Sequence, residues 1–140
     1  MRRVFTALAT GAITAALGLA TVPAHAATTD VNMAFGMSYG NSTTSGTIHF
    51  TDGYTATVSG AVHAASGQRR ICSEATNGDY YLSGPCSAWA SAGGANQPFT
   101  FDLRIALPGG VQRVYLTMYD EGGSGVAREY CTRNGCTRVY

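Results

Sequence analysis

The 140-residue sequence contains no lysine, a single tryptophan and little charge of either sign. Charged residues make up 12% of the chain, and nine arginines face eight acidic residues, so the formal net charge is only +1. Proteins that bind nucleic acid gather basic charge to attract phosphates, and disordered tails carry a high net charge. The composition excludes both classes, and we expect no nucleic-acid partner.

Long apolar runs are also absent after Ala26. Before it, Met1–Arg3 form a cationic start, Val4–Val22 an apolar run and Ala24–Ala26 a small-x-small exit. These three parts are typical of a secretory signal peptide. The alternative, an uncleaved membrane helix, is weakened by the threonines and glycines that dilute the run. We therefore expect residues 1–26 to be a signal peptide and the mature chain to be secreted, with no membrane segment.

Four cysteines lie in the expected mature chain: Cys72, Cys86, Cys131 and Cys136. In an exported protein this set indicates two disulfides, and the sequence leaves three connectivities open. We favour Cys72–Cys86 with Cys131–Cys136, because Asn134-Gly135 inside the second pair suits a hairpin turn. A zinc site is the rival interpretation, but the chain has no C-x2-C spacing. We expect neither a metal nor a cofactor.

Apolar and polar residues alternate with a period of two in several stretches. This period is typical of strands that bury one face. Glycine, proline and Asn-Gly turns separate the stretches. The sequence therefore predicts an all-β fold, a small disulfide-stapled antiparallel β-sandwich of about seven or eight strands. The predicted strands cover residues 31–39, 54–59, 99–107, 111–119, 126–131 and 136–140.

A polar tract, Gly40–Gly46, follows the first predicted strand and favours a flexible connection. We therefore divide the mature chain into an N-terminal strand with a linker, residues 27–46, and a β-sandwich domain, residues 47–140. The strand either belongs to the domain's own sheet or pairs with the sheet edge of another protein. In the second case its apolar face binds the partner through Val31, Met33, Phe35, Met37 and Tyr39.

No group of residues has the spacing of a catalytic site. A Ser/His/Asp hydrolase with a G-x-S-x-G elbow needs a helix after the nucleophile, and no helix is predicted. His49 is expected to point outward, and Asp120-Glu121 are neighbours that point to opposite faces of a strand. A ribonuclease could be drawn only from Glu74, Arg69 and His63, and no spacing supports that trio. We expect no enzyme activity and no catalytic residue.

Aromatic residues indicate binding more strongly than catalysis. Tyr115 and Tyr119 lie on the face of their predicted strand opposite its aliphatic residues. If the aliphatic face packs in the core, these tyrosines line an outer surface that suits protein interfaces or sugar stacking. Trp89 is either a core residue or an exposed anchor. The C-terminal hairpin also carries three arginines, which we interpret as a solvated edge: Arg128, Arg133 and Arg138.

Together with the signal peptide, several short stretches resemble the small adaptor component of bacterial umbrella toxin particles. They are Gly46–Phe50, Tyr54–Val62, Cys72, Phe99–Leu103 and Pro108–Val114. Those particles are exported polymorphic toxin assemblies, in which the adaptor links a lectin-bearing subunit to the large toxin-bearing stalk. The resemblance implies a protein without catalytic residues. It also implies that the N-terminal extension and the sheet edges contact secreted partners, the lectin-bearing and large toxin subunits.

The leading hypothesis is therefore an exported, non-enzymatic β-sandwich that binds protein partners as an adaptor in a secreted toxin assembly. Two alternatives stay open. One is a small secreted hydrolase inhibitor that presents Ser73–Pro85 as a rigid, disulfide-bounded loop. The other is a carbohydrate-binding module that uses Tyr115, Tyr119 and Trp89.

Overall fold

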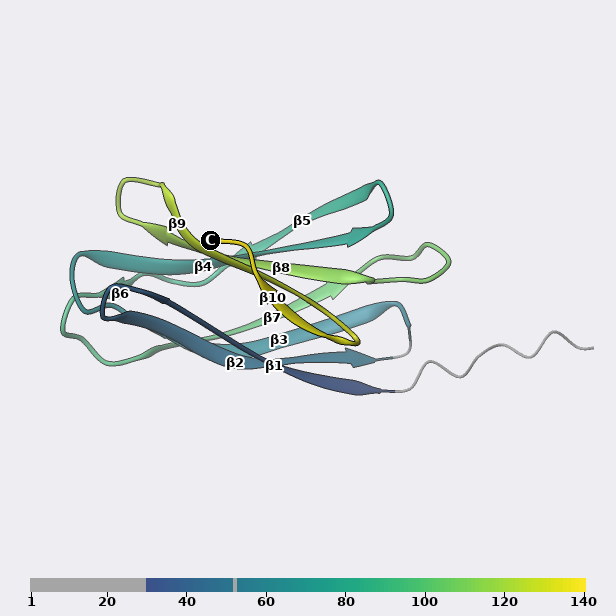
Figure 1. Ribbon diagram of the computed structural model, residues 1–140, viewed down its shortest axis with the longest axis horizontal. Coiled ribbons are helices and arrows are strands. Elements are labelled where there is room, and N and C mark those ends of the chain that lie inside the picture. The colour runs from purple at the N-terminus through teal and green to yellow at the C-terminus, as the bar shows by residue number, and fades with distance from the viewer. Residues whose placement is uncertain (1–29, 52) are drawn as a thin grey trace, which may run out of the picture.

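The computed structural model describes residues 30–51 and 53–140. These residues form ten strands in two antiparallel sheets, which make the two layers of a sandwich in Figure 1. The prediction of an all-β, disulfide-stapled sandwich is confirmed, with more strands than the predicted number. The expected signal peptide, residues 1–26, lies outside the described residues. Within the described ranges, no helix is long and apolar enough to cross a membrane.

The lower layer in Figure 1 is a four-stranded sheet with the order β1-β2-β3-β7. Its strands are Val31–Tyr39 (β1), Ser42–Thr51 (β2), Thr55–His63 (β3) and Gln97–Arg104 (β7). The upper layer is a six-stranded sheet with the order β10-β9-β8-β4-β5, and β6 also pairs with β4. Its strands are Gln68–Asn77 (β4), Tyr80–Cys86 (β5), Ala90–Ser91 (β6), Arg113–Asp120 (β8), Gly125–Thr132 (β9) and Gly135–Arg138 (β10).

The core lies between the two layers and is formed by the apolar positions of the alternating stretches. On β8 the residues that face inward are Val114, Leu116 and Met118, and all three are fully buried. On β7 the inward residues are Phe99, Phe101 and Leu103, which are also buried. The alternation in the sequence therefore identified the inward faces of both strands correctly.

β1 is an integral strand of the four-stranded sheet. One row of paired residues crosses all four strands, from Phe35 through Gly46 and Gly60 to Phe99. The two phenylalanine rings have centroids 6.3 Å apart, and a Cβ at Gly60 would come within 3.0 Å of both. The two glycines thus leave the space that the rings fill. β1 therefore supplies part of the chain's own core.

The prediction of a flexible tract over Gly40–Gly46 is wrong. β2 begins at Ser42, directly after a tight turn that joins it to β1. Ser42 and Thr44 are buried, and their hydroxyl groups make hydrogen bonds of 3.0 and 2.9 Å to backbone atoms. Because these hydroxyl groups have partners and threonine fits a pleated strand, a polar tract forms a sheet here. β2 therefore runs across the expected boundary at residues 46 and 47, and the described residues on its two sides belong to one sheet.

β4 and β5 were not predicted, and Ser73–Pro85 is a hairpin rather than a loop. The inward face of β4 explains the omission. Its buried residues are Arg69, Ile71, Ser73 and Ala75, of which only Ile71 is a large aliphatic residue. Period-two hydrophobicity is therefore weak in this strand even though it lies between β8 and β5.

Both favoured disulfides are confirmed. Cys72–Cys86 joins β4 to β5, and Cys131–Cys136 joins β9 to β10; each pair lies directly opposite in its antiparallel ladder. No free cysteine is found among the residues that the structure describes. A small β-protein with two disulfides fits an extracellular or otherwise oxidising location.

Candidate functional site

The outer face of the six-stranded sheet carries large polar and aromatic side chains. Because the aliphatic residues of β8 face the core, Tyr115 and Tyr119 point outward, as the alternation predicts. The strand register places Tyr115 between Glu74 of β4 and Tyr130 of β9. We call this surface the Arg–Tyr face and define it by its outward residues: Arg70, Glu74, Tyr81, Arg113, Tyr115, Tyr119, Arg128 and Tyr130.

Guanidinium groups cover the tyrosine rings at the centre of the Arg–Tyr face. The Arg128 Cζ lies 4.6 Å from the centroid of the Tyr115 ring. The Arg113 Cζ lies 4.5 Å from the Tyr130 centroid, and the two rings are 5.6 Å apart. These distances are typical of cation–π contacts. The result is a fixed, interleaved layer of arginine and tyrosine side chains.

Glu74 ties this layer to the hairpin of β4 and β5. Its Oε2 accepts a hydrogen bond of 2.5 Å from Arg128 Nη2, and both side chains are mostly shielded, with 18% and 28% exposure. A hydrogen bond to Glu74, together with burial and the charge of that carboxylate, raises the pKa of Tyr81 to about 12. In the same layer, the hydrogen bond of Arg113 to the Tyr115 hydroxyl raises the pKa of Arg113.

Trp89 fits neither alternative derived from the sequence. Its side chain is half-buried, and the Arg70 Cζ lies 4.6 Å from the centroid of its ring. It is therefore neither a core residue nor a free anchor. It extends the arginine–aromatic pattern toward the other end of β4.

The interpretation of three C-terminal arginines as a solvated edge is wrong. Arg128 pairs with Glu74. Arg133 lies over the buried ring of Phe50, with 5.0 Å between its Cζ and the ring centroid. Arg138 Nη2 donates a hydrogen bond of 2.5 Å to the Ser38 carbonyl oxygen of β1. Each guanidinium therefore holds two parts of the fold together.

The structure places the predicted partner-binding residues of β1 mainly inside the sandwich. Phe35 and Met37 are core residues, with 4% and 3% exposure. Met33 packs against the core and Val31 is half-buried. Only Tyr39 is exposed, and Arg69 lies over its ring. An intact sandwich therefore does not present this apolar face to a partner.

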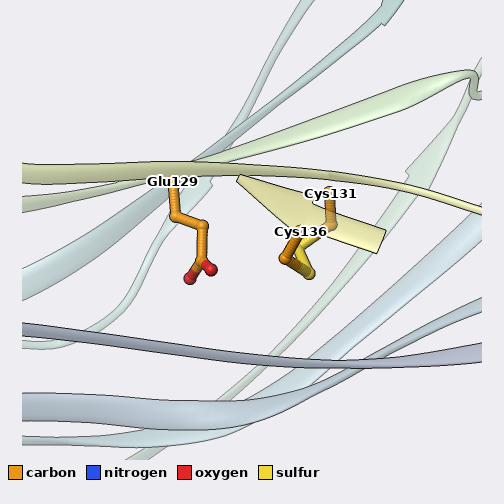
Figure 2. A group of neighbouring side chains, drawn as sticks. All are labelled: Glu129, Cys131 and Cys136. Atoms are coloured by element: carbon orange, nitrogen blue, oxygen red, sulfur yellow. A yellow bond between two sulfur atoms is a disulfide. The ribbon is translucent and has the colours of Figure 1, made fainter. Parts of the chain in front are cut away.

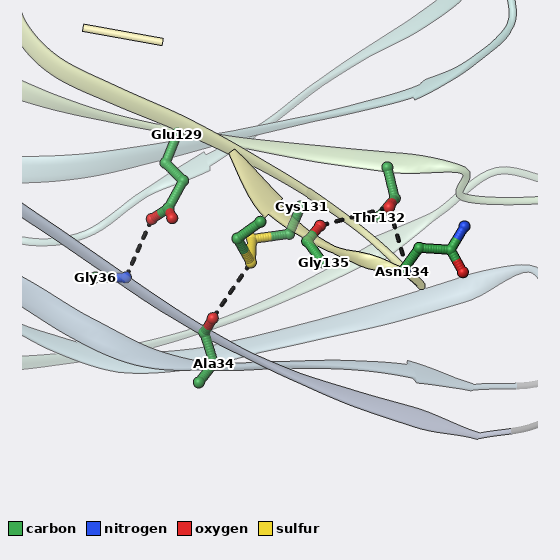
Figure 3. Close-up of a disulfide and its surroundings, with 8 residues drawn as sticks. Ala34, Gly36, Glu129, Cys131, Thr132, Asn134 and Gly135 are labelled. Carbon is green, nitrogen blue, oxygen red and sulfur yellow. Dashed lines mark hydrogen bonds between the residues drawn. A yellow bond between two sulfur atoms is a disulfide. The ribbon is translucent and has the colours of Figure 1, made fainter. Parts of the chain in front are cut away.

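The outer edge of β1 is also covered, as Figure 3 shows. The Gly36 N–H donates to Glu129 Oε2 at 3.1 Å. The Cys136 sulfur lies 3.2 Å from the Ala34 carbonyl oxygen, a contact without a proton because the sulfur is in a disulfide. With the Arg138 bond, side chains of β9 and β10 close an edge that a donated strand would leave open.

Glu129, Cys131 and Cys136 form the one group in the described ranges whose atoms are close enough to hold a metal, within 4.8 Å of one another. Figure 2 shows that the two sulfur atoms are bonded to each other. Cysteine binds a metal as the thiolate, so Cys131 and Cys136 do not provide thiolate ligands while their disulfide is intact.

The residues nominated for catalysis do not converge. Arg69 faces the core from β4, whereas Glu74 of the same strand faces outward. Asp120 Oδ1 accepts the Ser124 N–H at 2.8 Å and Glu121 Oε2 accepts the Gln68 N–H at 3.0 Å. These carboxylates therefore stabilise turns and strand ends.

Of the Arg–Tyr face, the alternation in the sequence predicts the outward positions of Tyr115 and Tyr119 but does not predict their neighbours Glu74, Arg113 and Tyr130. The outward positions of Arg128 and Tyr130 could have been predicted, because both residues alternate along β9 with the buried Ala127 and Cys131. The pairing of β8 with β4 and β9 was not readable, because strand order depends on the whole sandwich.

Comparison with known proteins adds no assignment. No protein-family model matches the chain. No curated protein matches its sequence, and no solved structure matches its fold.

Proposed function

We propose that this chain is a secreted, non-enzymatic protein-binding module and that the Arg–Tyr face is its contact surface. The observation that carries the proposal is the interleaved layer of Arg113, Tyr115, Arg128 and Tyr130. Tyrosine, tryptophan and arginine are the residues enriched at the energetic centres of protein interfaces. These side chains are already ordered by mutual contact, so binding costs less conformational entropy.

The same layer favours a protein over a sugar as the ligand. Sugar rings stack on open aromatic faces, but guanidinium groups lie over Tyr115, Tyr130 and Trp89. What remains for a ligand is guanidinium N–H groups, phenol hydroxyl groups and ring edges. This combination matches the mixed polar and apolar surface of another protein better than the flat apolar face of a sugar.

Secretion is part of the proposal. The two disulfides fit an oxidising compartment, and residues 1–26 have the sequence pattern of a signal peptide. Mass spectrometry of the exported protein tests this directly. We expect a mature N-terminus at residue 27 and no free thiol.

Within this function, the resemblance to the umbrella toxin adaptor supplies the specific hypothesis. An adaptor holds two partners at once, here a lectin-bearing subunit and a large toxin subunit. Because β1 is part of the chain's own core and its edge is covered, we assign one of these contacts to the Arg–Tyr face rather than to β1.

A second candidate, the hydrolase inhibitor, is favoured by the hairpin of β4 and β5. Tyr80 and Tyr81 are 48% and 53% exposed on β5, directly after its turn. Cys72–Cys86 braces the other end of this hairpin. A rigid hairpin with exposed aromatic residues suits insertion into an enzyme cleft.

Affinity capture from the culture supernatant of the producing cells separates these functions. The bait is the oxidised full chain, compared with the double variant Tyr115→Ala/Tyr130→Ala. The matched control is Thr47→Ala/Thr57→Ala on the outer face of the other sheet. We expect stoichiometric protein partners on the wild type and the control, and their loss from the tyrosine variant.

Two large partners captured together support the adaptor hypothesis. A single hydrolase whose activity falls on binding supports the inhibitor. Retention on insoluble polysaccharide that depends on Trp89 and Tyr119 supports the carbohydrate module. Equal capture by the tyrosine variant and the wild type contradicts the assignment to the Arg–Tyr face.

A further inference from the structure

A cleft of about 430 Å³ opens at one end of the sandwich. Three connections meet there: the turn between β4 and β5, the loop between β7 and β8, and the turn between β9 and β10. They lie toward the right-hand end of Figure 1. We call this hollow the end cleft; its polar lining consists of Thr76, Gln112, Arg113, Thr132, Arg133 and Asn134.

Among the described residues, the charged side chains that line the end cleft are all cationic. The cleft is lined by two guanidinium groups, and none of its described lining residues is a carboxylate. Arg133 Nη2 makes one long hydrogen bond, 3.4 Å to the Thr51 carbonyl oxygen. Its Nη1 is buried and has no hydrogen-bond partner among the described residues. Because a buried cationic N–H without an acceptor is costly, an anionic acceptor bound in the cleft would offset this cost.

Arg113 connects the end cleft to the Arg–Tyr face. It lines the cleft, donates one hydrogen bond of 2.8 Å to the Tyr115 hydroxyl, and lies over the Tyr130 ring. A guanidinium group has five N–H donors, so others stay available to a ligand. A partner seated on the face therefore reaches the cleft without crossing another element.

The walls of the end cleft are fixed before any ligand binds. The Asn77 side-chain amide donates to the carbonyl oxygens of Pro108 and Gly110 at 3.0 and 2.7 Å. The Gly78 N–H donates to Gln112 Oε1 at 3.2 Å. Gly110 has a φ of 54°, and a Cβ there would overlap the Gly53 carbonyl oxygen. The loop is thus docked onto the turn after β2, which lowers the entropic cost of binding.

From this geometry we infer that the end cleft binds a carboxylate on an acidic side chain of a protein partner. The inference rests on the proposed protein-binding function. Two planar guanidinium groups match a carboxylate by paired, charge-assisted hydrogen bonds. The volume lies at the lower end of the range for small-ligand sites, about 300–1,000 Å³, and is large enough for an aspartate or glutamate side chain.

A protein acid is favoured over a uronic acid or a phosphate for two reasons. The rings beside the cleft are covered by guanidinium groups, which removes the stacking surface that a sugar needs. An unmodified protein partner carries carboxylates and no phosphates. The cleft therefore adds charge selection to a contact that the Arg–Tyr face makes by shape and aromatic packing.

Titration of the oxidised full chain with small probes tests the inference without the partner. The probes are N-acetylglutamate, its neutral analogue N-acetylglutamine, glucuronate and inorganic phosphate, at constant ionic strength. NMR of the backbone amides reports where each probe binds. We expect N-acetylglutamate to shift the amides of Gly78, Gln112 and Asn134, and N-acetylglutamine to leave them unchanged.

Arg133→Gln is expected to weaken N-acetylglutamate binding about tenfold or more, the effect of one lost charge-assisted hydrogen bond. Arg133→Lys keeps the positive charge but lacks the planar guanidinium group. Its affinity for N-acetylglutamate should lie between those of the wild type and Arg133→Gln. Arg138→Gln removes the same charge at the end of β10 away from the cleft, outside both the cleft lining and the Arg–Tyr face, and should leave N-acetylglutamate binding unchanged. If Arg133→Gln does not fold, Arg113→Gln provides the same test of the small probes.

Equal responses to N-acetylglutamate and N-acetylglutamine overturn the inference, and so does an equal loss of N-acetylglutamate binding in Arg138→Gln and Arg133→Gln. Tighter binding of glucuronate or phosphate than of N-acetylglutamate also overturns it. Partner capture distinguishes the two proposals. If Tyr115→Ala/Tyr130→Ala loses the partner but Arg133→Gln does not, the face stands and the cleft inference fails. If no protein partner exists, N-acetylglutamate binding still decides whether the cleft selects carboxylates.

Discussion

The two outer faces of this sandwich rest on one apolar core but carry different side chains. On the four-stranded sheet, Thr47, Ser59 and Thr100 form a row of short hydroxyl groups across β2, β3 and β7. On the six-stranded sheet, the corresponding surface is the Arg–Tyr face, with its covered rings and the Glu74–Arg128 ion pair. Threonine on an exposed strand needs no reason beyond sheet propensity. Ordered arginine and tyrosine side chains require specific neighbours, and this difference singles out one face for recognition.

The largest effect is expected from the layer beneath the four-stranded sheet. Phe35→Ala removes a ring that fills the space over Gly46 and Gly60, and such changes cost about 3–5 kcal/mol. Thr47→Ala on the outer side of the same sheet is the control and should cost less than about 0.5 kcal/mol. Urea unfolding measures both. A loss below about 1 kcal/mol for Phe35→Ala would mean that β1 is not part of the core and would revive its role as a donated strand.

The inward faces of β1, β7 and β8 could be predicted from the sequence because their apolar residues alternate strictly with other residues. The prediction failed at β2, where buried hydroxyl groups such as that of Thr44 are satisfied only by a partner on the next strand. It failed at β4 for a related reason, since Arg69 faces inward. A polar side chain in a strand can be buried only when it has a hydrogen-bond partner, and the partner of Thr44 lies on another strand. A local sequence pattern does not show such a partner.

The candidate site likewise has one part that the sequence predicts and one part that depends on the fold. The outward direction of Tyr115 follows from the alternation of apolar residues along β8 alone. Its contact with Arg128 and the approach of Arg113 to Tyr130 depend on the order of β4, β8 and β9. The end cleft depends on three connections that meet only in the folded chain, so no motif in the sequence marks it.

Removing each disulfide should produce the next largest effects. Replacing both cysteines of Cys72–Cys86 by serine opens a loop with a sequence separation of 14, which the chain-entropy model values at about 3 kcal/mol. For Cys131–Cys136, with a separation of 5, the same model gives about 2 kcal/mol. Both bridges lie in the sheet that carries the Arg–Tyr face, so the loss of either should also weaken partner capture. Unfolding free energies in the opposite order would contradict this ranking.

A smaller effect concerns the ionisation of Tyr81 in the Arg–Tyr face. Hydrogen bonding to Glu74 raises its pKa from 10.0 to about 12, so the folded state holds this proton more tightly than the unfolded chain does. Its contribution to stability is therefore complete below pH 10 and is lost as the pH rises through about 12. Ultraviolet titration of tyrosinate, with Tyr81→Phe to identify the signal, should show this pKa. Glu74→Gln should lower it toward the ordinary value, and an unchanged pKa in that variant would refute the assigned cause.

The smallest effect is expected on the hydroxyl-bearing face of the four-stranded sheet. Thr57 Oγ1 donates a hydrogen bond of 2.7 Å to Asp102 Oδ1, and the pair is exposed to solvent. Because water replaces such a bond and valine keeps the β-branched shape, Thr57→Val should change stability by less than about 0.5 kcal/mol. It should also leave partner capture intact, whereas Tyr115→Ala/Tyr130→Ala abolishes it. If Thr57→Val loses the partner while its unfolding free energy is unchanged, the contact lies on this face, and the distinction between the two faces is reversed.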